Sequence, residues 1–282
     1  MERQIVDTAF RSGDPEFPDT ETRQAWYAAR RHVMDHLLRL IADSPWNEHL
    51  VLRGSLLLKA WLGDTAREPG DIDWVFRPAD VAAGSPIAQK LLKNLHALVT
   101  KRRHAGNAII QAHKVTIDKL GPYEQIAGHR IVFPWRAEGL PPGSIQMDIA
   151  FGDTLFVDPL PTPIPSPGEG SVVIWAARPD LALAWKLLWL ERDRAPRGKD
   201  LYDATLLAEW TPLSRALLDR VLQTGPGMDF ASLSLDFPTK WNVDWGEFKQ
   251  EYPWVVGKAI DWQYRLAAAL YPLFEQQSDS LA

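Results

Sequence analysis

Five prolines fall within residues 159–170, and they limit how far any regular element can run through that part of the chain. Proline fixes φ and lacks a backbone N–H, so it interrupts helices and central strands. The five are Pro159, Pro161, Pro163, Pro165 and Pro167. Strand-like patterns precede this stretch and mostly helical patterns follow it. We therefore predict an α/β core, with a mixed sheet and an N-terminal helix, in residues 1–165 and a mainly helical domain in residues 166–282.

Composition narrows the class of protein. The 282 residues include no cysteine, which excludes disulfides, thiolate metal sites and a cysteine nucleophile. The formal charge of -5 argues against a surface that binds nucleic acid all over, because phosphate contacts need clustered Lys and Arg. No stretch of the sequence resembles a signal peptide or a membrane span. We expect a cytoplasmic protein.

The core begins with alternating helix and strand. Apolar positions recur at helical spacing in residues 21–42, and residues 49–52 have the composition of a short strand. Gly54 stops that strand, and Ser55 opens a helix that runs to Leu62. The pattern then predicts strands at 71–76, 109–120, 123–135 and 145–151, and helices at 86–103, 181–194, 200–210, 214–223 and 255–276.

Asp71 and Asp73 are the best candidates for a metal site. Alternate residues of a strand point to one face, so these two carboxylates form a paired anionic site. They repel each other unless a cation lies between them. Magnesium is suitable, because protein carboxylates hold it while substrate phosphates and waters complete its coordination. A bare Asp-x-Asp also occurs at ordinary strand starts, so the pair needs support from its surroundings.

The turn at Gly54 and Ser55 supplies that support. Glycine lets backbone N–H groups come close to a phosphate, and the helix N-terminus that follows adds a favourable dipole and the serine hydroxyl. A strand, a tight turn, a helix and then a strand with two carboxylates together predict a phosphate-binding turn beside a metal.

A third carboxylate is expected on a neighbouring strand, where it would ligate a second ion or help to deprotonate an attacking hydroxyl. Asp148 is the candidate, because it lies among apolar residues, where an unpaired charge is costly. The alternative is a strand-end carboxylate that faces solvent. Asp153 and Asp158 are weaker candidates on looser segments.

The helical part contributes further polar candidates. Lys186 lies in an almost wholly apolar helix and needs a counter-charge, so it either binds a triphosphate or extends its ammonium to the surface. Asp200 and Asp203 share one face at the start of a helix. Taken alone, Asp200 is a helix cap and Asp203 a surface partner of Lys199.

Together these motifs resemble the AbiEii/AbiGii-type nucleotidyltransferase toxins, which include the MenT toxins and belong to the DNA polymerase β-like superfamily. The matching segments, in chain order, are residues 52–55 with Lys59, 71–73, 184–187 and 197–203. Their combination is far more specific than any one motif. The resemblance implies a nucleotidyltransferase core followed by a mainly helical C-terminal part.

The resemblance also implies roles for the matched residues, to which the residue-based candidate Asp148 is added. The expected nucleotide-binding residues are Gly54, Ser55, Lys59, Lys186 and Asp203. The expected catalytic residues are Asp71, Asp73, Asp148, Lys186 and Asp200. The expected metal ligands are Asp71, Asp73 and Asp148, with two magnesium ions, or manganese, as cofactor.

The activity implied by the resemblance is transfer of an NMP from an NTP to an acceptor hydroxyl. In the family the acceptor is RNA, including tRNA 3′ ends, and a separately encoded antitoxin restrains the toxin in toxin–antitoxin or abortive-infection (phage-defence) systems. We expect the RNA to follow Lys101, Arg102, Arg103, Arg192, Arg194 and Arg197, although such patches are often only solvated helix ends. The alternatives are a small-molecule, antibiotic-type nucleotidyltransferase and a degenerate nucleotide-binding module.

Overall fold

The computed structural model describes residues 14–120, 127–168, 170–225 and 233–275. It divides into two compact units. The sheet unit contains the described residues up to 61, together with 68–154 and 159–176; the helical unit contains 62–67, 155–158 and the described residues after 176. No helix in these ranges is long and apolar enough to cross a membrane.

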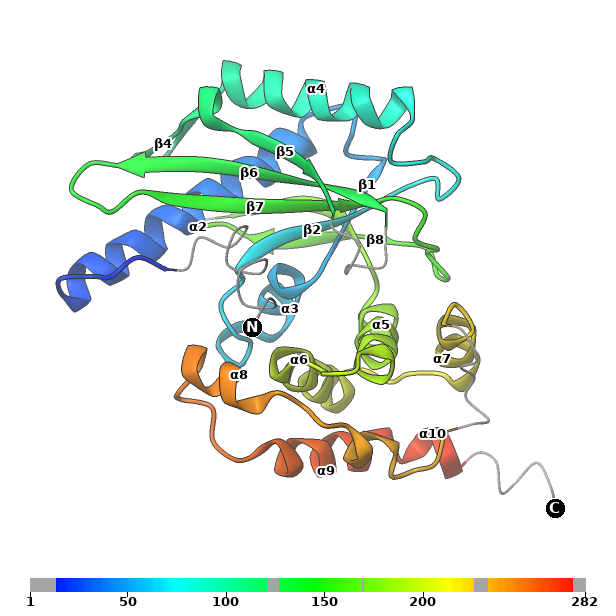
Figure 1. Cartoon of the computed structure of the whole chain (residues 1–282). Helices are drawn as coiled ribbons and strands as arrows, with labels where there is room; N and C mark the ends of the chain where they lie inside the picture. Colours follow the sequence, from blue (N-terminus) through cyan, green and yellow to red (C-terminus); the bar gives the residue numbers. More distant parts are fainter. Residues whose placement is uncertain (1–13, 121–126, 169, 226–232, 276–282) are drawn as a thin grey trace. The chain divides into compact units, whose positions relative to one another are not determined.

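The sheet unit is built on one mixed sheet (Figure 1). Along it the strands follow the order β3-β4-β6-β7-β2-β1-β9-β8, and β5 also pairs with β6. The pairs β2–β7 and β1–β9 are parallel, whereas β1–β2, β6–β7 and β8–β9 are antiparallel. The strands are β1 Leu50–Arg53, β2 Asp71–Phe76, β3 His104–Ala105, β4 Ala108–Ile110, β5 Thr116–Lys119, β6 Gly128–Ala137, β7 Gly143–Ala150, β8 Leu160–Pro165 and β9 Ser171–Ala176. The predicted α/β fold with a mixed sheet is confirmed.

The two faces of the central strands differ in polarity. Ile131, Phe133 and Trp135 of β6 are buried, whereas the residues between them are less buried. Trp135 packs against Trp26 of helix α2 (Thr20–Ala42), with ring centroids 5.4 Å apart. The period-2 pattern therefore buries Ile131, Phe133 and Trp135 on one face of β6 and places Arg130 and Arg136 on the other.

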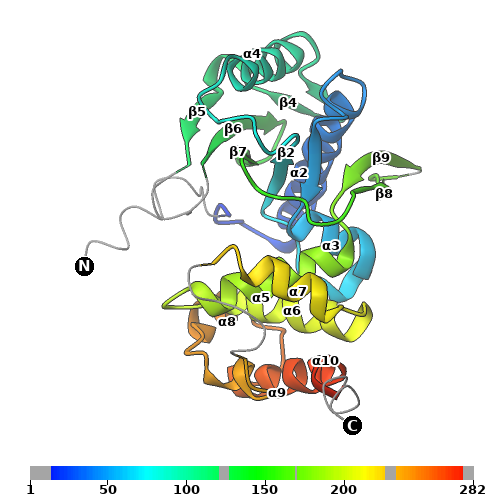
Figure 2. The same cartoon turned by 90° about the vertical axis from the view of Figure 1, so that its right-hand side faces the viewer.

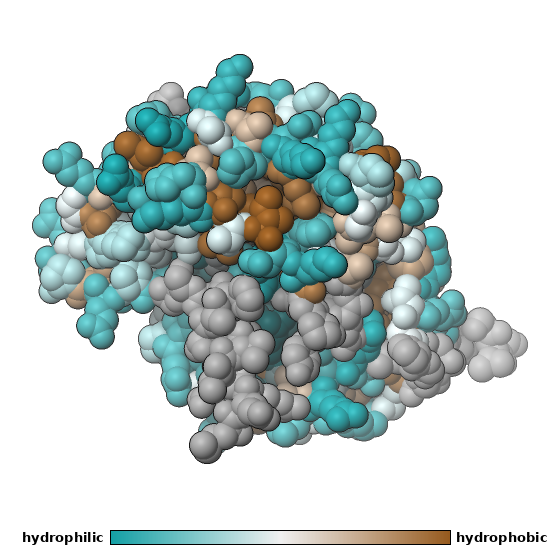
Figure 3. Space-filling model, turned by 45° about the horizontal axis from the view of Figure 1, so that its top comes forward, coloured by the Kyte–Doolittle hydropathy of each residue, from teal (hydrophilic) through white to brown (hydrophobic). Residues whose placement is uncertain are grey.

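Two further helices complete the sheet unit. Helix α3 (Ser55–Leu62) follows β1 directly, and Leu56, Leu57 and Leu58 in it are buried. Helix α4 (Pro86–Lys101) contacts α2, and the side chain of Ser85 caps it by accepting a hydrogen bond from the N–H of Ala88. The face of the sheet unit that comes forward in Figure 3 is largely hydrophilic, with apolar side chains gathered between the polar ones.

The proline-rich stretch is a strand, which differs from the boundary expected at residues 165 and 166. Strand β8 pairs with β9 over its whole length, and both strands belong to the sheet unit, which ends at Ala176. The prolines are tolerated because β8 is the last strand of the sheet, where a missing N–H does not interrupt a ladder on both sides.

The helical unit packs its helices around α6 (Figure 2). Helix α6 contacts α5, α8 and α9, and α5 also contacts α7. The elements are η1 Gly63–Thr65, α5 Pro179–Arg192, α6 Gly198–Trp210, α7 Arg215–Leu222, η5 Phe237–Lys240, α8 Trp245–Glu251, α9 Ala259–Leu270 and α10 Pro272–Glu275. The expected mainly helical C-terminal part is therefore present.

Several predicted boundaries differ from the observed ones. The strand expected at 109–120 is two strands, β4 and β5, separated by the short 3-10 helix η2 (Ala112–Lys114). The helix expected at 255–276 begins only at Ala259 and gives way to α10 after Tyr271. Part of the strand expected at 123–135, residues 123–126, lies outside the described residues.

Candidate active site

Gly54 forms the turn between β1 and α3, and this turn lies against the carboxylate of Asp73. Its φ of +81° is in the left-handed region, which favours glycine. A Cβ at this position would lie 2.2 Å from Oδ2 of Asp73. Glycine at this position was expected to let backbone N–H groups approach a phosphate. In the structure Asp73 occupies the space that a Cβ would need, so a side chain at position 54 would displace the carboxylate.

Asp71 and Asp73 lie on β2 and project from the same face of the sheet. In the parallel pairing with β7, Asp71 is opposite Gln146 and Asp73 is opposite Asp148. The hydroxyl of the buried Ser55, at the start of α3, lies 3.5 Å from Oδ1 of Asp71. The sheet therefore brings together the three predicted carboxylates and the predicted serine.

Asp148 is neither isolated nor simply exposed to solvent. Arg130, its register partner on β6, donates from Nε to Oδ1 at 2.9 Å and from Nη2 to Oδ2 at 2.7 Å. Gln146 donates from Nε2 to Oδ2 at 3.2 Å. Asp148 thus has the partner that its apolar setting requires. Within the described ranges, no group of three His, Asp or Glu side chains is placed so that it could hold a metal ion.

Two other basic residues of the sheet unit form ion pairs. Arg53, the register partner of Asp73 on β1, donates to Oδ2 of Asp153 at 2.6 Å. The ammonium of Lys59, expected to bind nucleotide, lies 2.7 Å from Oε1 of the exposed Glu68. Asp153, the weaker candidate for a third carboxylate, is therefore an ion-pair partner of Arg53.

Within the helical unit, Lys186 has the counter-charges that its apolar helix requires. Its Nζ lies 2.7 Å from Oδ1 of Asp200 and 3.0 Å from Oδ2 of Asp203, and all three side chains are buried. The ammonium therefore does not extend to the surface. Asp200 is not a helix cap and Asp203 is not a surface residue, because both carboxylates are used to neutralise buried cations.

Arg67 completes this cluster and was not identified from the sequence. It donates from Nε to Oδ1 of Asp203 at 3.0 Å and from Nη2 to Oδ2 at 2.9 Å, and it is buried. The hydroxyl of Tyr202 donates to the carbonyl of Thr65 at 2.5 Å, which fixes the same segment to α6. An arginine four residues before Asp71, in a loop otherwise rich in turn residues, was the available signal.

The charged cluster shifts the pKa values of its members. Burial alone would lower the pKa of Lys186, but Asp200 and Asp203 outweigh it and raise that pKa above its ordinary value. Burial alone would raise the pKa of Asp200, but Lys186, followed by Arg197 and Lys199, holds it well below its ordinary value. Lys186 and Asp200 are therefore both ionised at neutral pH.

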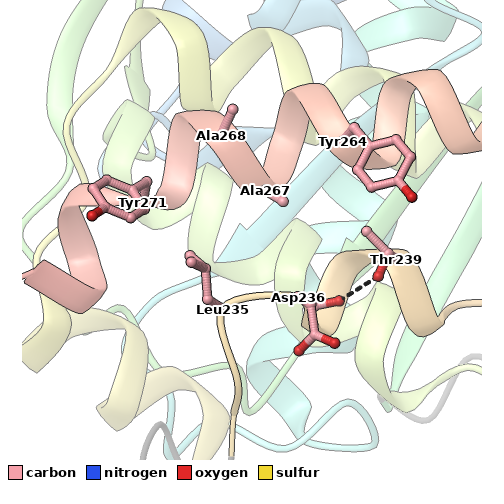
Figure 4. A pocket seen from close by; sticks show the side chains of 7 residues that line it. All are labelled: Leu235, Asp236, Thr239, Tyr264, Ala267, Ala268 and Tyr271. Atoms are coloured by element: carbon pink, nitrogen blue, oxygen red, sulfur yellow. Dashed lines mark hydrogen bonds between the residues drawn. The ribbon is translucent and has the colours of Figure 1, made fainter.

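A hollow of about 480 Å³ in the helical unit has a different chemistry (Figure 4). Tyr264 of α9 and Tyr271 at its C-terminal end flank alanine side chains on one side, and the carboxylate of Asp236 is the only charged group among the described lining residues. The lining residues are Leu235, Asp236, Thr239, Tyr264, Ala267, Ala268 and Tyr271. No predicted site residue lines this hollow, and its single charge is negative, so it does not suit a triphosphate.

The sequence of residues 36–262 matches the family model "Nucleotidyl transferase AbiEii toxin, Type IV TA system". This range contains every predicted site residue. The family match identifies the chain as a nucleotidyltransferase. Because the match spans most of its length, the chain belongs to the AbiEii toxin family. A comparison with curated protein sequences finds no significant match.

A solved structure shares the fold. MenT4, a nucleotidyltransferase toxin from Mycobacterium tuberculosis H37Rv, is 16% identical in sequence, with a TM-score of 0.57. The likeness covers 87% of this chain and 83% of the MenT4 chain. At this level of identity it establishes a common fold, in agreement with the mixed sheet and the helices described above.

Proposed function

We propose that this AbiEii-family toxin transfers an NMP from an NTP to a hydroxyl of RNA, at a tRNA 3′ end, with release of pyrophosphate, in a reaction that depends on magnesium. The observation that carries the proposal is the juxtaposition of Asp71, Asp73 and Asp148 on adjacent strands beside the turn at Gly54. Family membership supports nucleotidyl transfer. The metal is inferred from the chemistry of the residues, and the RNA acceptor from the resemblance to the toxin family.

The residues of the sheet unit fit a hard divalent cation. Carboxylate oxygens are the ligands that magnesium prefers, and Asp71 and Asp73 supply them from one face of β2. Oε1 of Gln146, opposite Asp71, is buried and accepts no hydrogen bond, which leaves an acceptor for a water of the hydrated ion. Asp71 and Asp73 would hold magnesium, which would offset negative charge on the phosphates, with Asp148 as the neighbouring carboxylate.

The chain's own groups would orient the nucleotide. The first N–H groups of α3 and the hydroxyl of Ser55 are suited to phosphate oxygens, because a helix N-terminus has unpaired donors and a favourable dipole. Lys186 has three N–H donors, of which Asp200 and Asp203 take two. We assign the third donor to the triphosphate.

The proposed RNA acceptor would bind to exposed basic residues. Lys101, Arg102 and Arg103 are exposed at the end of α4, and Arg102 forms an ion pair of 3.0 Å with Asp43. In the helical unit, Arg197 pairs with Asp200 at 3.3 Å, and we assign Arg192 and Arg194 to the same role. A separately encoded antitoxin is proposed as the partner that restrains the activity, as the family description implies.

The decisive experiment is an incubation of the purified protein with total RNA and each radiolabelled NTP in turn, with and without a magnesium chelator. Asp73→Asn should lower RNA labelling by at least about a hundredfold, because it removes a charged ligand of the magnesium that would offset negative charge in the transition state. Asp80→Asn makes the same change at an exposed position just after β2 and should leave labelling unchanged. Equal labelling by Asp73→Asn and wild type would refute the assignment.

The same assay tests the acceptor. Reversing Arg102 and Arg103 to Glu should lower RNA labelling and its dependence on salt, because phosphate contacts release counterions. Reversing Lys90 and Lys93, two exposed lysines earlier on α4, is the charge-matched control and should have little effect. Labelling of small hydroxyl compounds in place of RNA, with no response to either reversal, would identify a small-molecule nucleotidyltransferase.

A further inference from the structure

Charged residues form a row across five neighbouring strands of the sheet unit. The register pairs Asp118 with Arg130, Arg130 with Asp148, Asp148 with Asp73, and Asp73 with Arg53. Register partners on adjacent strands project from the same face. The signs alternate along the row except at its centre, where Asp148 and Asp73 are neighbours.

Two carboxylates at directly opposed positions destabilise a sheet unless a cation offsets them. At Asp148 the cation is a guanidinium, since Arg130 contacts both oxygens. Arginine is always charged, and its planar fork matches a carboxylate with two parallel hydrogen bonds. The pair is only slightly exposed, at 16% for each side chain, so solvent screens it weakly.

The acceptor capacity of Asp148 is mostly used. A carboxylate offers about four lone-pair sites. Arg130 occupies two of them, and Gln146 occupies a third. Two-point coordination of a metal by Asp148 would require Arg130 to leave. Asp71, by contrast, is the register partner of Gln146, whose Oε1 is an unused acceptor.

We infer that Arg130 takes the place of a cation at Asp148, so that the sheet unit holds one divalent cation, on Asp71 and Asp73, before a nucleotide binds. A second cation would enter only with the phosphates of the NTP. Arg130 is therefore a positioning residue, which acts on the metal site through Asp148. The inference rests on the proposed function, because it assumes that the carboxylates bind a divalent cation.

The test is a titration of the full-length protein with Mn²⁺ in the absence of nucleotide, with free Mn²⁺ measured by electron paramagnetic resonance. The wild type should bind one Mn²⁺ per chain, and Asp73→Asn should lose it. Arg130→Gln removes a positive charge near the ion and should tighten Mn²⁺ binding by about fivefold or more. Arg130→Lys, which keeps the charge, should stay within about twofold of the wild type.

Two controls separate charge from structure. In Arg130→Gln with Asp148→Asn the net charge of the wild type is restored, so the affinity should return to within about twofold. Arg136→Gln makes the same change at an exposed position of β6, roughly 20 Å along the strand, and should have no effect. If Arg130→Gln does not fold, Asp148→Asn remains a test, because it should still bind one Mn²⁺ per chain, with affinity lowered only about fivefold by the unneutralised guanidinium. Loss of the ion in Asp148→Asn would show that Asp148 is a ligand and would overturn the inference.

Binding of two Mn²⁺ ions to the wild type, or an unchanged affinity in Arg130→Gln, would overturn the inference. If the wild type binds no Mn²⁺ but labels RNA in the presence of magnesium, the inference is wrong and the proposed function stands. If it binds one Mn²⁺ through Asp73 but transfers no nucleotide to any acceptor, the proposed function fails separately.

Discussion

Gly54 and Asp73 fit together so closely that a Cβ at position 54 would lie 2.2 Å from Oδ2 of the aspartate. The left-handed φ of +81° adds a second restriction, because most side chains avoid that conformation. The turn that starts α3 therefore also fixes the position of a proposed metal ligand.

We predict that Gly54→Ala destabilises the protein by about 2 kcal/mol or more and abolishes transfer, because it combines backbone strain with displacement of Asp73. Gly63→Ala is the matched control, since Gly63 has a φ of +57° but, beyond its own chain neighbours and helix backbone, no described atom lies within 4 Å of its Cβ position. That variant should show the backbone cost of about 1 kcal/mol alone and retain activity. Urea unfolding and RNA labelling would measure both effects, and equal stability of the two variants would contradict the prediction.

Lys186→Met should lower the free energy of unfolding of the helical unit by about 3–5 kcal/mol, because it leaves Asp200 and Asp203 buried with too little positive charge. The comparison is Lys240→Met, which removes an exposed ion pair with Asp236 and should cost less than about 1 kcal/mol. Urea titrations of both variants would test this. A small effect of Lys186→Met on stability, with loss of activity, would show that the ammonium serves the nucleotide and not the fold.

The ion pair of Lys186 and Asp200 should also determine how the free energy of unfolding depends on pH. Because its pKa is depressed in the folded state, the Asp200 carboxylate stabilises the fold at pH values above its pKa in the unfolded chain, about 3.9. This contribution is lost as the pH falls towards the pKa of the folded state. Because its pKa is raised in the folded state, the Lys186 ammonium stabilises the fold at pH values below its pKa in the unfolded chain, about 10.4. This contribution is lost only as the pH rises through the higher pKa of the folded state. The urea midpoint of Asp200→Asn should therefore fall less between about pH 5 and pH 3 than that of the wild type. Parallel profiles would exclude this role for Asp200.

Arg67→Met tests a buried arginine against an exposed one. Arg67 and Arg265 both make two parallel hydrogen bonds to a carboxylate, on Asp203 and Glu209, but only the Arg67 pair is buried. Arg67→Met should cost about 3 kcal/mol or more, and Arg265→Met less than about 1 kcal/mol. Chemical denaturation of the two variants would measure the difference. Similar values would mean that burial does not strengthen the Arg67 pair.

Local patterns predicted much of the sheet unit. Gly54 and Ser55 between an apolar strand and an apolar helix, and the alternation around Asp71 and Asp73, are determined by neighbours in the sequence. The observed β1, α3 and β2 agree with that reading. The charge partners could not be predicted in the same way. Arg130 is 18 residues from Asp148, and the register of two strands brings them together.

The helical unit shows the same limit. Lys186 was recognised as needing a counter-charge because its helix is apolar, but the identity of the partner depends on how α5 packs on α6. Arg67 lies 136 residues from Asp203, so no local pattern links the two. Sequence reasoning identified candidate polar residues, and tertiary packing decided which charges neutralise one another.

The prolines of β8 affect whether a strand of another chain can pair with this edge of the sheet. Pro161, Pro163 and Pro165 occupy alternate positions, so their nitrogens point in one direction within the plane of the sheet. Because the opposite side of β8 is paired with β9, that direction is outward. An incoming strand would find no N–H donors at three successive positions there, which disfavours the edge-to-edge growth by which sheets aggregate. Replacing these prolines with threonine would restore the backbone N–H donors at all three positions, and another strand could then pair with this edge.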